Sequence, residues 1–313
     1  MIYTITLNPA LDKTVVIPSF AVDKVNRVTQ VRVDPGGKGI NVSKMIENLG
    51  GTSVAYAALG GEAGRQWQNL VQGFRFPVSR VQAHGETRTN LKVVDPHLHT
   101  NTDINEPGAA LSKSALESLN EKLKGQLQPG DILVLSGSVP FGVDKDIYGK
   151  LTALAHTRGA RTIVDAEGPL LTEALKARPY LVKPNQYELG TYVGRPLSGV
   201  EDIAAAAEQM LQDGAQMVLV SMGADGALLF HHGVDGGSRQ FRAAAPSVCV
   251  SSTVGAGDSM VGAFAYGLEQ GMPVEKVLRL AVAAGTAAVT CDGSQAPTLE
   301  QIERIKEQIC VVS

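Results

Sequence analysis

The chain has 313 residues, of which 44% are hydrophobic and 19% charged, and its formal net charge is −3. This composition is typical of a globular protein with a substantial core, and the slight negative charge argues against nucleic acid or an anionic membrane as the main partner. Three scattered cysteines exclude a disulfide framework and favour a reducing, cytoplasmic setting. Neither a targeting signal nor a membrane-spanning segment is expected, since the apolar runs are too short.

Strand patterns and helix patterns alternate along most of the chain, which predicts mostly parallel strands covered by helices on both faces. Ser198 and Glu201 have the spacing of a capping box. In chain order we expect a strand at Ile2–Leu7, a helix at Asn41–Leu49, a strand at Ser53–Leu59, a helix at Ser114–Leu127, a strand at Ile132–Leu135, a helix at Ile147–Arg158, strands at Arg161–Asp165 and Leu181–Lys183, a helix from Ser198 to Gln212, a strand at Met217–Ser221, and glycine-rich helices from about Asp258 and Val274.

Two stretches interrupt this rhythm. Lys13–Val33 is strand-like and carries mixed charge, and Arg88–Ile104 alternates in the same way with no helix nearby. They predict an accessory sheet that serves as a lid over a ligand, as a dimer contact, or as both. The chain shows no internal repeat and no linker, so we expect one domain over residues 1–313 with lid strands at about 13–33 and 88–104.

A small-residue turn opens the first of the two C-terminal helices, at Ser252–Met260. Because Gly255, Ala256 and Gly257 have little side-chain bulk, their amides can converge on an anion at the positive end of the helix. Asp258 would then accept a hydroxyl proton beside that anion hole, as phosphoryl transfer requires. The alternative is that Asp258 merely caps the helix.

A second glycine cluster, Pro35–Asn41, also precedes a helix. The backbone can approach a ligand closely there, and Lys38 and Asn41 would add polar contacts; the alternative is a tight turn with a solvated lysine. Neither cluster is a Walker A loop or a dinucleotide-binding Gly-x-Gly-x-x-Gly fingerprint.

A third segment, Lys183–Glu188, follows a short strand. Asn185 and Glu188 are three residues apart and share one face if the chain turns helical. Since Mg²⁺ keeps several waters and takes few protein ligands, Glu188 could hold the hydrated ion. The alternative is a helix start with an N-terminal glutamate.

Together these segments resemble the PfkB family of ribokinase-like sugar kinases, with signatures at Gly36–Gly51 and Ser252–Gly262 and a magnesium motif at Asn185–Glu188. The resemblance covers nearly the whole chain. It implies a three-layer α/β/α sandwich with a mostly parallel central sheet and a small β-sheet lid. It also implies ATP and Mg²⁺ as cofactors, and a homodimer through the lid.

Within the family the chain is most similar to the phosphosugar branch, through Thr6–Asp12 and Thr87–Asn90, and to its 1-phosphofructokinases through Thr100–Gly108. This implies ATP-dependent phosphorylation of fructose 1-phosphate, a small phosphorylated ketose, to fructose 1,6-bisphosphate. Asp103 stands where the minor 6-phosphofructokinase has an arginine that helps to hold the sugar phosphate, which disfavours that activity. A tagatose-6-phosphate kinase and a non-catalytic sugar-phosphate sensor stay open as alternatives.

The resemblance assigns a role to each matching residue. Asp258 is the catalytic base, and Gly255, Ala256 and Gly257 form the anion hole. Arg88, Lys38 and, more weakly, Arg27 are candidates for holding the substrate's existing phosphate. The remaining assignments place Asp12, Gly37, Gly39, Asn41 and Ser138 on the sugar side, Lys183, Asn185, Ser221 and Gly223 at the nucleotide, and Glu188 at the metal.

Two histidine pairs are predicted to have no role in the site. His97 and His99 near Asp95 lie in a polar run that indicates a solvated turn, and His231–His232 are expected in a hairpin bend.

Overall fold

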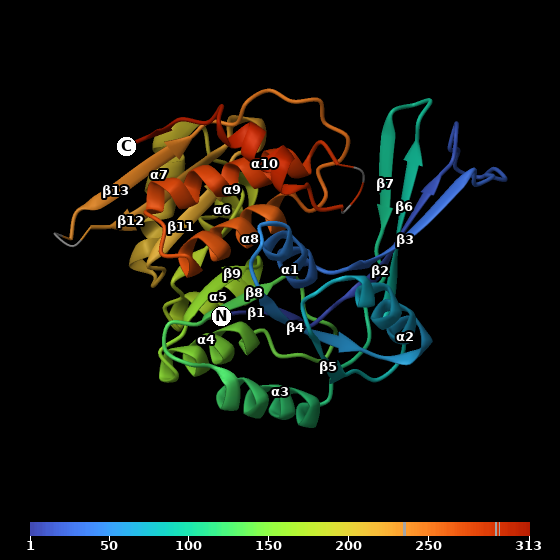
Figure 1. Ribbon diagram of the computed structural model, residues 1–313, viewed down its shortest axis with the longest axis horizontal. Helices are drawn as coiled ribbons and strands as arrows, with labels where there is room; N and C mark the ends of the chain where they lie inside the picture. The colour runs from blue at the N-terminus through green and yellow to red at the C-terminus, as the bar shows by residue number, and fades with distance from the viewer. Residues whose placement is uncertain (234–235, 292, 294) are drawn as a thin grey trace.

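The body of the protein is one large sheet (Figure 1). The computed structural model describes residues 1–233, 236–291, 293 and 295–313. The strands of the sheet are β1 (Ile2–Thr6), β4 (Ser53–Leu59), β5 (Val78–Gln82), β8 (Ile132–Ser136), β9 (Arg161–Asp165), β10 (Leu181–Val182), β11 (Met217–Ser221), β12 (Ala227–His232), β13 (Ser238–Ala243) and β14 (Val311–Val312). Their order is β14-β13-β12-β11-β10-β9-β8-β1-β4-β5. The strands from β11 to β5 pair in parallel, and β12, β13 and β14 pair antiparallel at the other edge.

Helices cover both faces of this sheet. They are α1 (Lys38–Asn48), α2 (Gly61–Leu70), α3 (Lys113–Gln126), α4 (Ile147–Thr157), α5 (Gly168–Lys176), α6 (Gln186–Tyr192), α7 (Gly199–Gln212), α8 (Ala256–Glu269), α9 (Val274–Ala288) and α10 (Leu299–Lys306), with short 3₁₀ turns η1 (Val71–Gly73) and η2 (Gly223–Asp225). One core joins the sheet to α1, α8, α9 and α10, and a second core joins it to α3, α4, α5, α6 and α7. The molecule is therefore a three-layer sandwich, as expected.

The strand β8 shows why the sheet needs a helix layer on each side. Successive side chains of a strand point to opposite faces. Ile132 and Val134 enter the core with α1 and α8, whereas Leu133 and Leu135 enter the core with α3 and α4. All four side chains are buried. An uninterrupted apolar run of this kind is typical of a strand that is covered on both faces.

A smaller sheet stands beside this body, at the right of Figure 1. Its strands are β2 (Ala10–Val16), β3 (Gln30–Gly36), β6 (Arg88–Asp95) and β7 (Thr100–Ile104), in the order β3-β2-β6-β7. The β2–β6 pair is parallel and the other two pairs are antiparallel. The two irregular stretches of the sequence thus form one accessory sheet. That it works as a lid, and that the whole chain acts as a single domain, stay predictions.

Some local predictions were wrong. Ser198 is the N-cap of α7, but its side chain makes no capping hydrogen bond, so the predicted capping box with Glu201 does not form. Instead the Asp202 carboxylate accepts the Ser198 N–H at 2.9 Å. The ion pair between Asp202 and Arg195 holds Asp202, rather than Glu201, at this end of the helix. His231 and His232 lie in β12, not in a bend, and the His231 ring stacks on Phe241 of β13.

Elements with weak patterns were missed, namely α2, α5, α10, β5, β12, β13 and β14. His97 and His99 lie in a turn after Asp95, as expected. The Asp95 carboxylate accepts hydrogen bonds from the backbone N–H groups of Ser19, Phe20, His97 and Leu98. Among the described residues, no helix has both the length and the apolar character needed to cross a membrane.

Candidate active site

The carboxyl ends of the parallel strands meet at one edge of the large sheet, where open α/β sheets bind their ligands. Thr6, Ser136, Asp165 and Ser221 end β1, β8, β9 and β11 there, and Lys183 directly follows β10. A cavity of about 380 Å³ lies at this edge, between the strand ends, α1, α8 and the small sheet. It is lined by Asp12, Gly37, Lys38, Asn41, Arg88, Asn90, Asp165, Lys183, Asn185, Glu188, Ser221, Val254, Gly255, Gly257 and Asp258.

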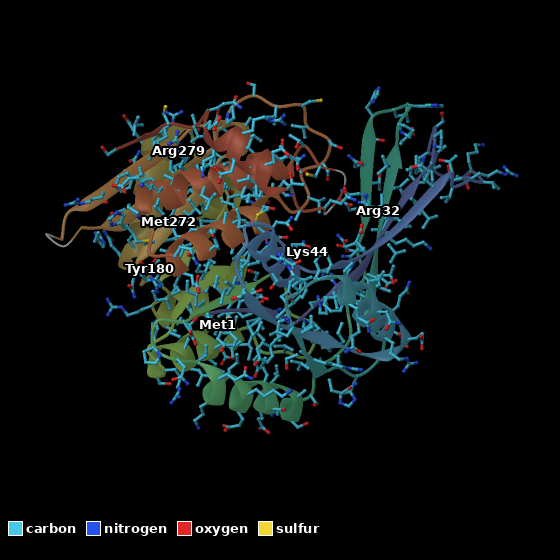
Figure 2. The ribbon with its side chains drawn as sticks, in the orientation of Figure 1. Met1, Arg32, Lys44, Tyr180, Met272 and Arg279 are labelled. Carbon is cyan, nitrogen blue, oxygen red and sulfur yellow. The ribbon has the colours of Figure 1, made fainter. Side chains whose placement is uncertain are left out.

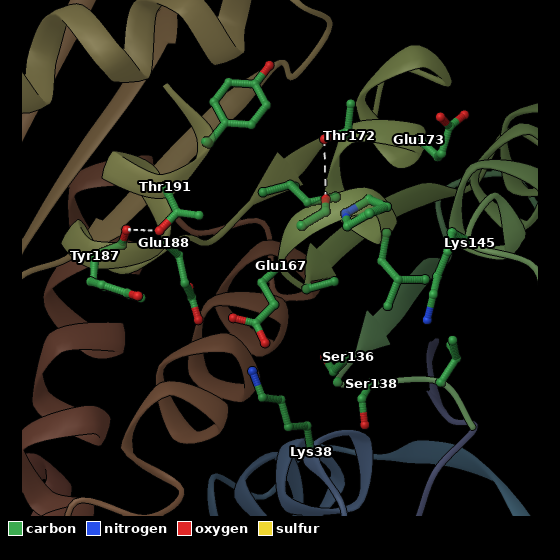
Figure 3. A pocket seen from close by; sticks show the side chains of 18 of the residues that line it. Lys38, Ser136, Ser138, Lys145, Glu167, Thr172, Glu173, Tyr187, Glu188 and Thr191 are labelled. Atoms are coloured by element: carbon green, nitrogen blue, oxygen red, sulfur yellow. Dashed lines mark hydrogen bonds between the residues drawn. The ribbon is translucent and has the colours of Figure 1, made fainter. Parts of the chain in front are cut away.

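A larger cavity of about 1380 Å³ adjoins the first one and shares Lys38, Arg88 and Glu188 with it. It extends from the strand ends across α5 and α6, and Ser138 lies in its lining. Figure 3 shows Lys38 and Glu188 extending into this space from α1 and α6.

The turn before α8 has the geometry of an anion site. Gly255 is the N-cap of this 14-residue helix and has a φ of 79°, which a residue with a side chain rarely adopts. In the described part of the chain no side chain caps this end. Because the first amides of a helix lack partners within it, the amides that follow Gly255 can donate to a bound anion, and Gly255 and Gly257 line the cavity.

Asp258 lies in the first turn of α8 and is only 6% exposed. Its Oδ2 accepts a hydrogen bond from Nδ2 of Asn41 at 2.8 Å. Burial raises the pKa of Asp258 to about 6, against the opposing effects of Lys38, Asn41 and Lys183. A carboxylate with its pKa close to neutrality is well suited to accept a proton at physiological pH.

Asp165, at the end of β9, is a residue of the site that the sequence analysis missed. Its carboxylate pairs with Lys38 at 3.2 Å and with Lys183 at 3.2 Å. Burial favours the neutral acid, but the two ammonium groups outweigh it and hold the pKa of Asp165 below its usual value. The pKa of Lys38 is raised in turn, chiefly by Asp165. An acidic residue at the end of a buried strand was the signal available in the sequence.

One side of the cavity is built from the small sheet. Asp12 on β2 accepts a hydrogen bond from Asn90 on β6 at 3.0 Å, and burial raises the pKa of Asp12. A Cβ atom on Gly36 would lie 2.0 Å from the Asp12 carboxylate, so a glycine is required opposite it. Asn90 and Gly36 lie in segments that carry the family resemblance, but the sequence assigned no role in the site to either residue.

Arg88 lies in the lining of both cavities. Its Nη1 and Nη2 donate to the carbonyl oxygens of Glu106 and Asn8 at 3.2 and 2.9 Å, and its buried Nε has no partner among the described residues. Asn8 also donates to the hydroxyl of Ser138 at 3.1 Å. Ser138 and Arg88 therefore lie at the same end of the site.

Four predicted residues are not in the lining of either cavity: Arg27, Gly39, Gly223 and Ala256, which directly follows Gly255. Arg27 is exposed in the loop between β2 and β3 and lines neither cavity. Gly39 faces β1, where a Cβ would lie 2.5 Å from Thr6 Oγ1, so it permits close packing of α1 on the sheet. Gly223 begins η2 with a φ of 58°, next to Ser221.

Asn185 and Glu188 form a complete capping box at the start of α6. Asn185 Oδ1 accepts the Glu188 N–H at 2.7 Å, and Glu188 Oε2 accepts the Asn185 N–H at 2.8 Å. Both residues line the cavity. The helix-start alternative is confirmed, and a contact of Glu188 with a bound ion stays a prediction. Among the described residues, no group of three or more His, Cys, Asp or Glu side chains is placed to hold a metal ion. One carboxylate facing a polar cavity fits Mg²⁺ that is held largely through water.

A doubly wound sheet that places a glycine turn with free helix amides beside a carboxylate of raised pKa suits an enzyme that transfers phosphoryl groups to an alcohol. The family model for "pfkB family carbohydrate kinase" matches residues 5–302. The chain belongs to this family of ATP-using carbohydrate kinases.

Individual relatives extend over nearly the whole chain. The 1-phosphofructokinase of Rhodobacter capsulatus is 37% identical over 311 residues, covering 99% of this chain and 97% of the relative. The D-tagatose-1-phosphate kinase of Bacillus licheniformis is 33% identical, with 94% of each chain covered. Phosphofructokinase-2 from Escherichia coli in complex with fructose-6-phosphate has a TM-score of 0.89 at 35% identity over 98% of each chain, and a tetrameric inhibited form of that enzyme has also been solved.

Proposed function

We propose that this kinase transfers the γ-phosphoryl group of ATP to fructose 1-phosphate and forms fructose 1,6-bisphosphate. The observation that carries the proposal is Asp258, a buried carboxylate of raised pKa beside the Gly255 turn. The similarity to 1-phosphofructokinases supports the choice of substrate.

In this proposal Asp258 removes the proton from the free primary hydroxyl of the sugar. The sugar oxygen forms a bond to the γ-phosphorus, and the bond from that phosphorus to the bridging oxygen of ADP breaks. The amides of Gly255, Ala256 and Gly257 donate to the oxygens of the phosphoryl group in transfer, where negative charge is spread. Asp12 and Asn41 hold and orient the sugar side.

The nucleotide phosphates would lie near Lys183 and Asn185, with Ser221 and Gly223 at the turn after β11. Lys183 is 5% exposed and its ammonium contacts Asp165, so its position is fixed before the nucleotide binds. Glu188 would hold Mg²⁺ through water, and the ion would supply positive charge next to the phosphates.

Arg88 is the stronger candidate for the phosphate that the substrate already carries. Arg88 lies in the lining of both cavities, and a guanidinium can hold phosphate through parallel hydrogen bonds. The ammonium of Lys38 is instead directed to Asp165. Asn8 donates a hydrogen bond to the Ser138 hydroxyl and accepts one from Arg88. This supports contacts of Ser138 and Arg88 with the same end of the sugar.

We also propose that two chains form a homodimer through the small sheet, which closes over the sugar. Six large apolar side chains of this sheet and its loops are exposed in the single chain: Val22, Val25, Val28, Val31, Leu98 and Ile104. Arg27 lies in the same loop as Val25 and Val28. A cytoplasmic location belongs to this proposal and is supported by the low cysteine content.

A relative named D-tagatose-1-phosphate kinase favours a second candidate, the corresponding tagatose sugar. Because a ketofuranose is nearly symmetric from end to end, one site can present either primary hydroxyl to Asp258. Tagatose 6-phosphate therefore has to be compared as well.

The test measures ADP formation with fructose 1-phosphate, fructose 6-phosphate, tagatose 1-phosphate and tagatose 6-phosphate. We expect the highest kcat/KM with fructose 1-phosphate. A clear preference for any other sugar overturns the substrate. Binding of sugar phosphate without ATP turnover would instead support the sensor, since fold alone does not fix function.

A further inference from the structure

One buried cation near the site has no role in the mechanism above. Lys44 lies on α1 and is only 5% exposed. Figure 2 shows it in the middle of the molecule, beside α1 and between the helical layer and the small sheet. It follows Asn41 by three residues, so both side chains lie on one face of the helix.

The Lys44 ammonium has three neighbours. Its Nζ donates to the carbonyl oxygen of Pro35 at 2.6 Å and to Asn41 Oδ1 at 3.4 Å, and it lies 5.6 Å from the ring centroid of Phe74. Pro35 is directly followed by Gly36 and then by Gly37, which lines the smaller cavity. Lys44 thus connects this segment to Asn41.

These contacts fix which way the Asn41 amide points. An ammonium donates hydrogen bonds and cannot accept one, so it selects the oxygen of the amide. With Oδ1 facing Lys44, the Nδ2 group faces Asp258 and donates to its carboxylate at 2.8 Å. The reversed amide would place its oxygen against a carboxylate, which is unfavourable.

The surrounding charges keep Lys44 in place. Burial lowers the pKa of Lys44, while Asp34, Asp12 and Asp258 favour its charged form and Arg32 opposes it. The groups that act on Asp258 are Lys38 and Asn41 from α1, Asp165 from the end of β9, and Lys183 after β10. Lys44 lies behind Asn41 in this arrangement, away from direct contact with a ligand.

We propose that Lys44 is a positioning residue that acts on the base Asp258 through Asn41, by holding the amide in the orientation that donates to the carboxylate. This inference rests on the proposed role of Asp258. It assigns a function in the transfer step to a side chain that itself cannot reach the substrate.

A double-mutant cycle tests the relay. Lys44→Met keeps the length of the side chain and removes the charge, and we expect kcat to fall about tenfold, with KM changed less than twofold. In an Asn41→Ala background the same substitution should change kcat less than twofold, because the intermediary is gone. Lys44→Arg should recover most of the activity, and Lys122→Met, at an exposed position of α3, should leave kcat unchanged.

Two results overturn the inference: full kcat in Lys44→Met, or the same loss of kcat in both backgrounds. If Lys44→Met does not fold, Lys44→Leu takes its place, since it is also apolar and has no donor for Asn41.

A second readout needs no turnover. The carboxyl of Asp258 can be followed by ¹³C NMR in aspartate-labelled protein and assigned by its loss in Asp258→Asn. Its pKa should rise in Lys44→Met and stay constant in Lys122→Met; an unchanged pKa in Lys44→Met contradicts the relay. If the wild-type chain binds sugar phosphate without turnover, the proposed function fails, and this titration still decides the role of Lys44.

Discussion

Two buried aspartates of the site differ in their chemistry because their neighbours differ. Asp165 is 1% exposed and lies between two lysines, so its pKa is low and it stays ionised. Asp258 is 6% exposed and accepts one neutral hydrogen bond from Asn41, so burial dominates and raises its pKa to about 6. The first carboxylate stabilises the fold as a partner of cations, and the second is held in a less stable charged state that suits a base.

The two aspartates therefore predict opposite changes in stability. Asp258 has a raised pKa in the folded state, so the folded protein loses stability as pH rises from about 4 to about 6 and does not regain it above. Asp258→Asn should raise the thermal unfolding midpoint at pH 8, by the equivalent of about 1–3 kcal/mol, and the gain should vanish near pH 4. Its kcat should fall by about 10²- to 10⁴-fold.

Asp165→Asn is the matched control. The low pKa of Asp165 means that its contribution is present at neutral pH and is lost as pH falls through that pKa. Removing its charge leaves two cations without their carboxylate, which should cost about 3–5 kcal/mol at pH 8. Calorimetry of both variants from pH 4 to 8 checks the pair. A similar loss of stability in both at pH 8 would contradict the base assignment.

At the scale of elements, the catalytic geometry depends on how closely α1 and α8 approach. Gly262 lies in α8, where a Cβ would meet Met45 Cβ at 2.8 Å and the Val42 carbonyl oxygen at 2.9 Å. Val42, Met45, Val261 and Phe264 of these helices are completely buried in one core. The same contact brings Asn41 of α1 to Asp258 of α8, so packing of the two helices and orientation of the proposed base are one feature.

Gly262→Ala should separate the two helices. We expect a loss of stability of about 1–3 kcal/mol from overpacking, and a lower kcat because the Asn41–Asp258 hydrogen bond is stretched. Gly125→Ala in α3 is the control, since a Cβ there meets nothing within 4 Å and alanine favours a helix by up to about 1 kcal/mol. Urea unfolding and steady-state kinetics measure both effects. Equal stability and equal kcat in the two variants would show that the contact between α1 and α8 can accommodate an additional methyl group.

For the whole molecule, the small sheet combines two surfaces. Its inner end supplies Asp12, Arg88 and Asn90 to the cavity. Its loops expose Val22 at 85% and Val25 at 81%, which is unusual for neighbouring apolar residues on a surface without a partner. A dimer through this sheet would bury these side chains and hold the sugar side of the cavity in place.

The double substitution Val22→Asp and Val25→Asp should prevent dimerisation, because it places charges in an apolar contact. Sedimentation velocity should show a dimer for the wild type and a monomer for this variant, and kcat/KM for the sugar should fall with the dimer. Phe141→Asp is the control, since Phe141 is 89% exposed on the loop between β8 and α4 and should not affect the mass. A monomeric wild-type chain would refute the dimer.

The sequence by itself determined the features that depend on neighbouring residues. The buried run at β8 predicts a strand covered on two faces, and the small residues around Gly255 predict a turn that opens α8, which the structure shows as left-handed at Gly255. The segment Asn185–Glu188 predicts a helix start, and the structure completes it as a capping box. Local sterics and hydrogen bonds within a few residues decide each of these.

The tertiary structure alone decided how these parts act on each other. Asn41 and Asp258 are 217 positions apart, and Lys38 and Asp165 are 127 apart, so no local pattern reveals their contacts. The same holds for Asp12 with Asn90, and for the exposed position of Arg27. Burial and the distances between charges set the state of a carboxylate, and both arise only when distant segments pack together.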